Sequence, residues 1–141
     1  RTFHPFIAPM KAAGKGTLVG IASVAAIRGL SGAGAYCASK AAVVQYCESL
    51  RVELHGTGVK VTTILPGYID TPMTQQNPYK MPFLMQPADF AARAVAAIDK
   101  QKSYTVIPWQ MGVVAKLLRI LPNGLYDKLF SGRERKPRAG E

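Results

Sequence analysis

TLVGIA, residues 17–22, is the stretch that decides the fold, and Ser23 follows it directly. It is a short apolar run after the Gly14-Lys15-Gly16 turn, with the length and flanks of a buried strand. A second run, VKVTTIL at 59–65, is β-branched and apolar on both faces. This pattern is typical of a central parallel strand that helices cover on both sides.

The segments around these two strands alternate with them. Apolar residues recur at helical spacing from Ala35 to His55, and Ala88 to Lys100 is rich in strong helix formers. Tyr104 to Ile107 suits a third strand, and Met111 to Leu121 an amphipathic helix. The order strand, helix, strand, helix, strand predicts the α/β class, with a parallel sheet and right-handed crossovers.

Composition limits the class of protein. The chain has 141 residues, of which 48% are hydrophobic and 18% charged, as in one soluble globular domain. Cys37 and Cys47 lie about 15 Å apart along one predicted helix, so they cannot pair with each other. Two unpaired cysteines favour a reducing compartment, and we expect the cytoplasm. His4 and His55 are isolated from other possible ligands, so we expect no metal site.

The charge is unevenly distributed. The formal net charge is +10, and the basic residues gather at the two ends of the chain. Aromatic residues are not interleaved with them as a base-stacking surface requires, so we expect no nucleic acid partner. We expect residues 1–130 to form one domain and residues 131–141 a basic, flexible tail.

Tyr36 and Lys40 are the first candidates for chemistry. They are four residues apart near the start of the long predicted helix, so both lie on one face. A neighbouring ammonium favours the tyrosinate and helps the phenol to exchange a proton with a carbonyl oxygen. Such pairs are also common on exposed helix surfaces, where they have no catalytic role. Ser23 favours a functional role for this pair, because parallel sheets bind ligands at the carboxyl ends of their strands. A serine at a strand end can also simply form a hydrogen bond with a backbone group.

Three linked motifs extend this reading: IASVA at 21–25, GLSGAGAYCASKAA at 29–42 and PGYIDTP at 66–72. In order and spacing they resemble the short-chain dehydrogenases/reductases. The resemblance implies the carboxyl-terminal portion of a Rossmann-like doubly wound parallel sheet, and we expect its amino-terminal nucleotide-binding half to be missing. Residues 1–13 resemble only the end of the helix that precedes the first of these strands.

The resemblance also implies roles for individual residues. Ser23 would orient the substrate, Tyr36 would be the general acid/base, and Lys40 would tune Tyr36 and bind the nicotinamide ribose. Pro66, Gly67, Ile69 and Thr71 would lie against the nicotinamide carboxamide. The cofactor would be NADP or NAD, because the residue that selects between them would lie upstream.

The expected activity is the interconversion of an alcohol and a carbonyl. The proline-rich stretch 71–87 is predicted to be an irregular loop with at most short helical turns. Its apolar side chains could form a substrate lid, which suggests a hydrophobic small-molecule substrate, or could pack on the body; they are Met73, Tyr79, Met81, Phe83 and Met85.

The same residues are compatible with other functions. The chain could be an inactive fragment or a degenerate member of the family that acts as a helix-mediated interaction module. The helix 35–55 resembles the family's subunit-pairing helix, so we expect a homo-oligomer. Residues 111–130 combine leucines with Lys116, Arg119 and Lys128, which is compatible with peripheral membrane contact.

Overall fold

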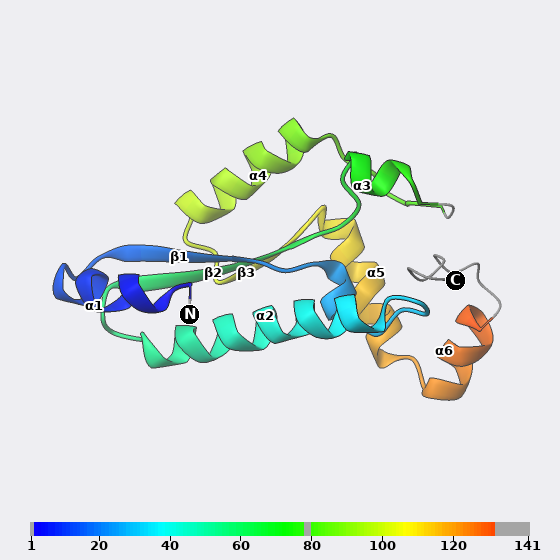
Figure 1. Ribbon diagram of the computed structural model, residues 1–141, viewed down its shortest axis with the longest axis horizontal. Helices are drawn as coiled ribbons and strands as arrows, with labels where there is room; N and C mark the ends of the chain where they lie inside the picture. Colours follow the sequence, from blue (N-terminus) through cyan, green and yellow to red (C-terminus); the bar gives the residue numbers. More distant parts are fainter. Residues whose placement is uncertain (1, 78–79, 132–141) are drawn as a thin grey trace.

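Three parallel strands form the centre of the molecule in a computed structural model that describes residues 2–77 and 80–131. Their order is β1 (Gly16–Ile21), β2 (Val59–Pro66) and β3 (Tyr104–Ile107), with β2 in the middle (Figure 1). Ile21 pairs with Ile64, and Pro66 pairs with Ile107. The predicted α/β class, with a parallel sheet as in one part of a Rossmann-like fold, is confirmed.

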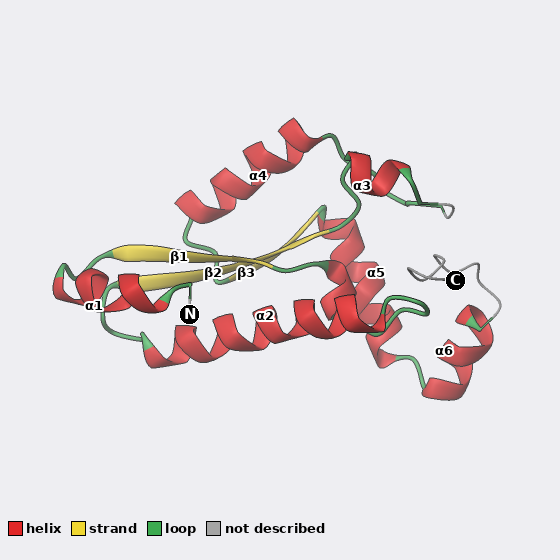
Figure 2. Ribbon diagram, viewed as in Figure 1, coloured by secondary structure: helices red, strands yellow, loops and turns green. Residues whose placement is uncertain are grey.

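Helices cover both faces of this sheet. Figure 2 shows α4 on one face and α2 on the other, while α5 crosses the end of the sheet where the strands finish. The helical segments are α1 (His4–Ala12), the 3-10 turn η1 (Val24–Ala26), α2 (Gly34–Glu53), α3 (Pro72–Gln75), α4 (Pro87–Asp99), α5 (Trp109–Ile120) and α6 (Asn123–Phe130).

The core is divided between the two faces of the sheet. On the α2 side, Cys47 and Leu50 pack with Leu18 and Val61, and all four are buried. On the α4 side, Ile64 packs with three other buried side chains, namely Met85, Ala94 and Ile107. The apolar character of both faces of β2 therefore reflects its burial between two helical layers.

Element boundaries differ slightly from the sequence-based expectations. The long helix ends at Glu53 rather than His55, and Leu54 to Gly56 form a turn in which Gly56 has a φ of +80°. Before α4 begins at Pro87, the stretch from Thr71 contains only the short helix α3 among its described residues, as predicted. Of the predicted tail 131–141, every residue after Ser131 lies outside the described residues.

None of the helices in the described parts of the chain combines the length and apolar character that spanning a bilayer requires.

Candidate functional site

Ser23 lies just beyond the carboxyl end of β1. Its hydroxyl oxygen accepts a hydrogen bond from the backbone N–H of Ala25 at 3.2 Å and so caps the turn η1. The side chain is mostly buried, at 8% exposure. Ser23 therefore does satisfy a backbone group, but a hydroxyl can accept and donate at once. Its O–H can still donate to a substrate oxygen.

Tyr36 and Lys40 occupy the first two turns of α2, as predicted. The ammonium nitrogen of Lys40 lies 5.8 Å from the centroid of the Tyr36 ring. The same nitrogen donates to the backbone carbonyl of Ile21, the last residue of β1, at 3.4 Å. Lys40 thus connects the start of α2 to the end of β1, close to Ser23. The Tyr36 side chain is 48% exposed, so a substrate can reach its phenol.

Pro66 and Gly67 lie at the same edge of the sheet, at the end of β2. The N–H of Gly67 donates to the carbonyl of Ile107 at 2.8 Å, which continues the ladder past the strand. A Cβ placed on Gly67 would come within 3.0 Å of the Met111 side chain. The glycine therefore lets this turn lie directly against the start of α5.

Ile69 and Thr71 lie farther along the same connection. Ile69 forms an isolated parallel bridge with Met85. Thr71 begins α3 through a capping box, in which its N–H donates to the hydroxyl oxygen of Thr74 at 2.9 Å. The structure thus brings Ser23, Tyr36 and Lys40 around the end of β1, and it places Ile69 and Thr71 on the segment that follows β2.

Asp70 was not anticipated from the sequence. Its carboxylate accepts hydrogen bonds from the side-chain amides of Gln75 at 2.9 Å and Gln86 at 3.3 Å. These two bonds, Gln75 first, hold the pKa of Asp70 below its ordinary value. Asp70 consequently links α3 to the residue that precedes α4.

The described lid residues differ in their exposure, and Met81 is half-buried. Met73 and Phe83 are exposed, whereas Met85 is buried in the core with Ile64. Tyr79 lies outside the described residues. Met85 therefore packs on the body of the protein. Only the exposed side chains remain candidates for a substrate lid.

Arg28 is a second residue that sequence reasoning missed. Its guanidinium donates to the backbone carbonyls of Leu118 and Leu121, the latter at 2.7 Å, at the carboxyl end of α5. It also donates to the Asn123 side chain at 3.2 Å, at the start of α6. A cation at this position satisfies the carbonyls that a helix leaves without partners. No local pattern reveals partners that lie 90 or more residues away.

The aromatic ring of Tyr126 completes this contact. The Arg28 guanidinium carbon lies 3.8 Å from the ring centroid, and the Tyr126 hydroxyl donates to the carbonyl of Gly29 at 2.6 Å. Gly29 begins the loop that leads to Tyr36. Arg28 and Tyr126 therefore attach α5 and α6 to the loop that positions Tyr36.

A surface groove of about 550 Å³ lies beside these residues. Its walls include Ala25, Arg28, Cys37 and Arg119, but not Ser23, Tyr36 or Lys40. The groove is therefore next to the candidate catalytic side chains and does not contain them. Within the described ranges, no group of three His, Cys, Asp or Glu side chains could hold a metal ion.

Comparison with known proteins relates this arrangement to a family. The family model described as short chain dehydrogenase matches residues 1–81. An uncharacterized oxidoreductase of Myxococcus xanthus (strain DK1622) is 43% identical over 113 residues, which are 80% of this chain and 45% of the relative. The human protein named short-chain dehydrogenase/reductase 3 is 33% identical over 137 residues, 93% of this chain and 45% of that protein.

Solved structures share the fold. A short chain dehydrogenase from Burkholderia cenocepacia J2315, crystallised in complex with NADP, superposes with a TM-score of 0.75 at 24% identity. The match covers 90% of this chain and 52% of the other. The chain thus spans about half the length of the relatives that it matches. Because the family model covers more than half of the 141 residues, the chain belongs to the short-chain dehydrogenase family.

Proposed function

We propose that this chain is part of an NAD(P)-dependent oxidoreductase that interconverts an alcohol and a carbonyl, with Tyr36 as the general acid/base. The observation that carries the proposal is the grouping of Tyr36, Lys40 and Ser23 around the carboxyl end of β1. The names of the relatives support it, because they include oxidoreductases and a dehydrogenase bound to NADP.

Each of the three side chains has a part in the proposed reaction. In carbonyl reduction, the phenol of Tyr36 gives its proton to the carbonyl oxygen, and the Lys40 ammonium stabilises the tyrosinate that remains. Ser23 donates a hydrogen bond to the same oxygen and holds it in place. In alcohol oxidation, the tyrosinate removes the hydroxyl proton. A bound nicotinamide dinucleotide would supply or accept the hydride.

The residues present fit such a cofactor. An ammonium group has three donors, and Lys40 directs one to the carbonyl of Ile21. Among the described residues, no carboxylate lies within ion-pairing distance of Lys40. Its remaining donors can therefore bind the hydroxyls of a nicotinamide ribose. We propose that Pro66, Gly67, Ile69 and Thr71 lie against the carboxamide, with either NADP or NAD as the nucleotide.

The substrate is proposed to be a hydrophobic small molecule. Met73 and Phe83 are exposed on the segment that follows the Pro66-Gly67 turn. Apolar side chains on such a segment can cover an apolar substrate and exclude water from the reacting atoms.

The proposal is tested on the longest open reading frame that contains these 141 residues. We expect the encoded protein to oxidise NADPH or NADH when hydrophobic ketones or aldehydes are added. The Ser23→Ala variant should have a lower kcat. Ser49→Ala is the matched control, because Ser49 bonds to Glu53 on the exposed side of α2. Equal kcat values for the two variants would refute the role of Ser23. Absence of both nucleotide binding and turnover would refute the enzyme reading.

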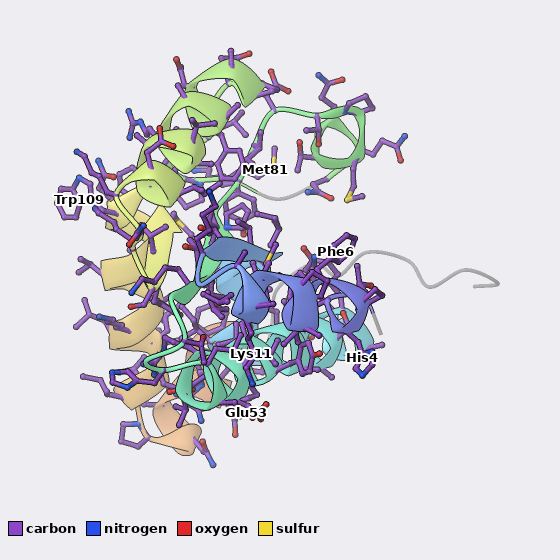
Figure 3. The ribbon with its side chains drawn as sticks, turned by 90° about the vertical axis from the view of Figure 1, so that its left-hand side faces the viewer. His4, Phe6, Lys11, Glu53, Met81 and Trp109 are labelled. Atoms are coloured by element: carbon purple, nitrogen blue, oxygen red, sulfur yellow. The ribbon has the colours of Figure 1, made fainter. Side chains whose placement is uncertain are left out.

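A helix-mediated interaction module is the alternative. Tyr46 and Val52 on α2 are exposed, and Tyr46 stacks on Phe3 beside α1, with ring centroids 6.2 Å apart. Figure 3 shows α1, with His4, Phe6 and Lys11, next to the end of α2 marked by Glu53. We propose that this face of α2 pairs subunits in a homo-oligomer, whether or not the protein is an enzyme. The unpaired, buried Cys37 and Cys47 favour a cytoplasmic location as a further proposal.

A further inference from the structure

The outer side of α5 carries an apolar stripe. Trp109, Val113, Leu117 and Ile120 recur at helical spacing, and all four are exposed, Trp109 to 68% and Ile120 to 76%. Trp109 lies at the outer edge of the molecule and points away from the sheet (Figure 3). The opposite side of the helix is buried through Met111 and Ala115. The α5 stripe, defined by these four exposed residues, therefore has no partner within the described chain.

Cationic side chains border the α5 stripe. A groove of about 240 Å³ between α4 and β3 reaches Trp109, and its walls include Arg93, Lys100 and Lys102 but no acidic residue. Asp89 and Asp99, the two acids of α4, are not among its walls. Helix α5 itself adds the exposed Lys116 and contains no acid. An apolar stripe with a cationic border is the pattern of a surface that binds an anionic interface.

We propose that this face docks on the surface of an anionic lipid bilayer. The α5 stripe enters the region between headgroups and acyl chains, where an indole ring such as that of Trp109 is favoured. Lys116 lies within the stripe, and its long stem allows the ammonium to reach the headgroup phosphates. The groove cations meet the same phosphates. The helix lies on the membrane and does not cross it, and the proposal does not depend on the proposed reaction.

Charge argues against a second copy of the chain as the occupant. A two-fold dimer would place this face against itself, and the cations that border it would repel each other. The apolar stripe argues against a nucleic acid, which would leave Val113, Leu117 and Ile120 without apolar partners. An anionic bilayer is the partner that matches both the stripe and its border.

The single tryptophan of the chain, Trp109, reports directly on this contact. The purified chain is titrated with vesicles of phosphatidylcholine alone or mixed with phosphatidylglycerol. We expect the Trp109 emission to move to shorter wavelength only with the anionic vesicles, and the shift to decline with salt. Ile120→Asp, and the pair Lys100→Glu with Lys102→Glu, should weaken binding roughly tenfold or more.

Matched controls change the same side-chain types elsewhere. Val95→Asp alters an exposed apolar residue of α4 that is not among the walls of the groove, and Lys11→Glu with Lys15→Glu alters two cations near α1. Both should bind as the parent does, and circular dichroism should show all variants folded. An unchanged Trp109 emission, or equal losses in the controls, would overturn the proposal. The proposal would also be overturned if the Trp109 emission shifted with protein concentration in the absence of vesicles, and if sedimentation showed dimers over the same concentrations.

Discussion

Gly20 is a residue of β1 that lies directly against α2. A Cβ placed there would overlap the sulfur of Cys47, which is completely buried on α2. Gly20→Ala should therefore lower the free energy of unfolding by about 1–3 kcal/mol, as in other overpacked cores. Gly124→Ala is the control, because a Cβ there meets nothing within 4 Å. Denaturant titration of both variants measures the difference, and equal stabilities would show that β1 and α2 are not packed as described.

The buried thiol of Cys47 predicts a loss of stability in alkali. Burial raises the pKa of Cys47 above its ordinary value of 9.0, and a hydrogen bond with Thr63 partly offsets this effect. Because the folded-state pKa is raised, the stabilisation is complete below pH 9 and is lost as the pH rises further, where the unfolded thiol ionises first. Unfolding at pH 8 and pH 10 should show this decline, and Cys47→Ala should decline less steeply between them.

At the residue scale, the sequence predicts where Ser23, Tyr36 and Lys40 lie in the fold, but it does not predict long-range contacts such as those of Arg28. The spacing of Tyr36 and Lys40 places both on one helical face, and Ser23 follows a recognisable strand. The partners of Arg28 lie 90 or more residues away, so no local pattern reveals them. For Met85 the sequence allowed both a lid position and packing on the body, and its side chain packs in the core.

At the scale of elements, Arg28 is expected to hold α5 and α6 in place. Arg28→Met removes its hydrogen bonds to the carbonyls of Leu118 and Leu121 and its contact with Tyr126. Bonds to a charged donor are worth about 1.5–3 kcal/mol each, so local opening of the two helices should become at least tenfold more frequent. Hydrogen exchange should then be faster in residues 109–130 and unchanged in β2.

Arg51→Met is the control for Arg28. Arg51 makes an exposed ion pair with Glu48 at 3.9 Å on α2, and such pairs contribute little. If both variants left exchange in α5 and α6 unchanged, the attachment by Arg28 would be wrong.

The elements themselves were predictable because each has a local cause. The β-branched run at 59–65 gives β2, and the alanine-rich segments give α2 and α4. Element ends were less predictable, because they depend on contacts such as the Thr71–Thr74 capping box and on the turn at Gly56.

At the scale of the whole molecule, the parallel sheet positions the proposed chemistry. β1 and β2 finish at one edge, so Ser23, Lys40 and the Pro66-Gly67 turn come to the same end of the sheet. The α/β class with a parallel sheet followed from the order of strands and helices, and the Rossmann-like arrangement followed from the family resemblance. The arrangement of α5 and α6 did not, because it depends on long-range contacts and not on periodicity.

The most direct test of the proposed chemistry compares two tyrosines of α2, in the protein encoded by the open reading frame that contains this chain. Tyr36 is the proposed acid/base, whereas Tyr46 is exposed to a similar degree and stacks on Phe3. Tyr36→Phe should lower kcat for carbonyl reduction by about 10²–10⁴-fold, with nicotinamide nucleotide binding retained, and Tyr46→Phe should leave kcat unchanged. A Tyr36→Phe enzyme as fast as its parent would contradict the assignment.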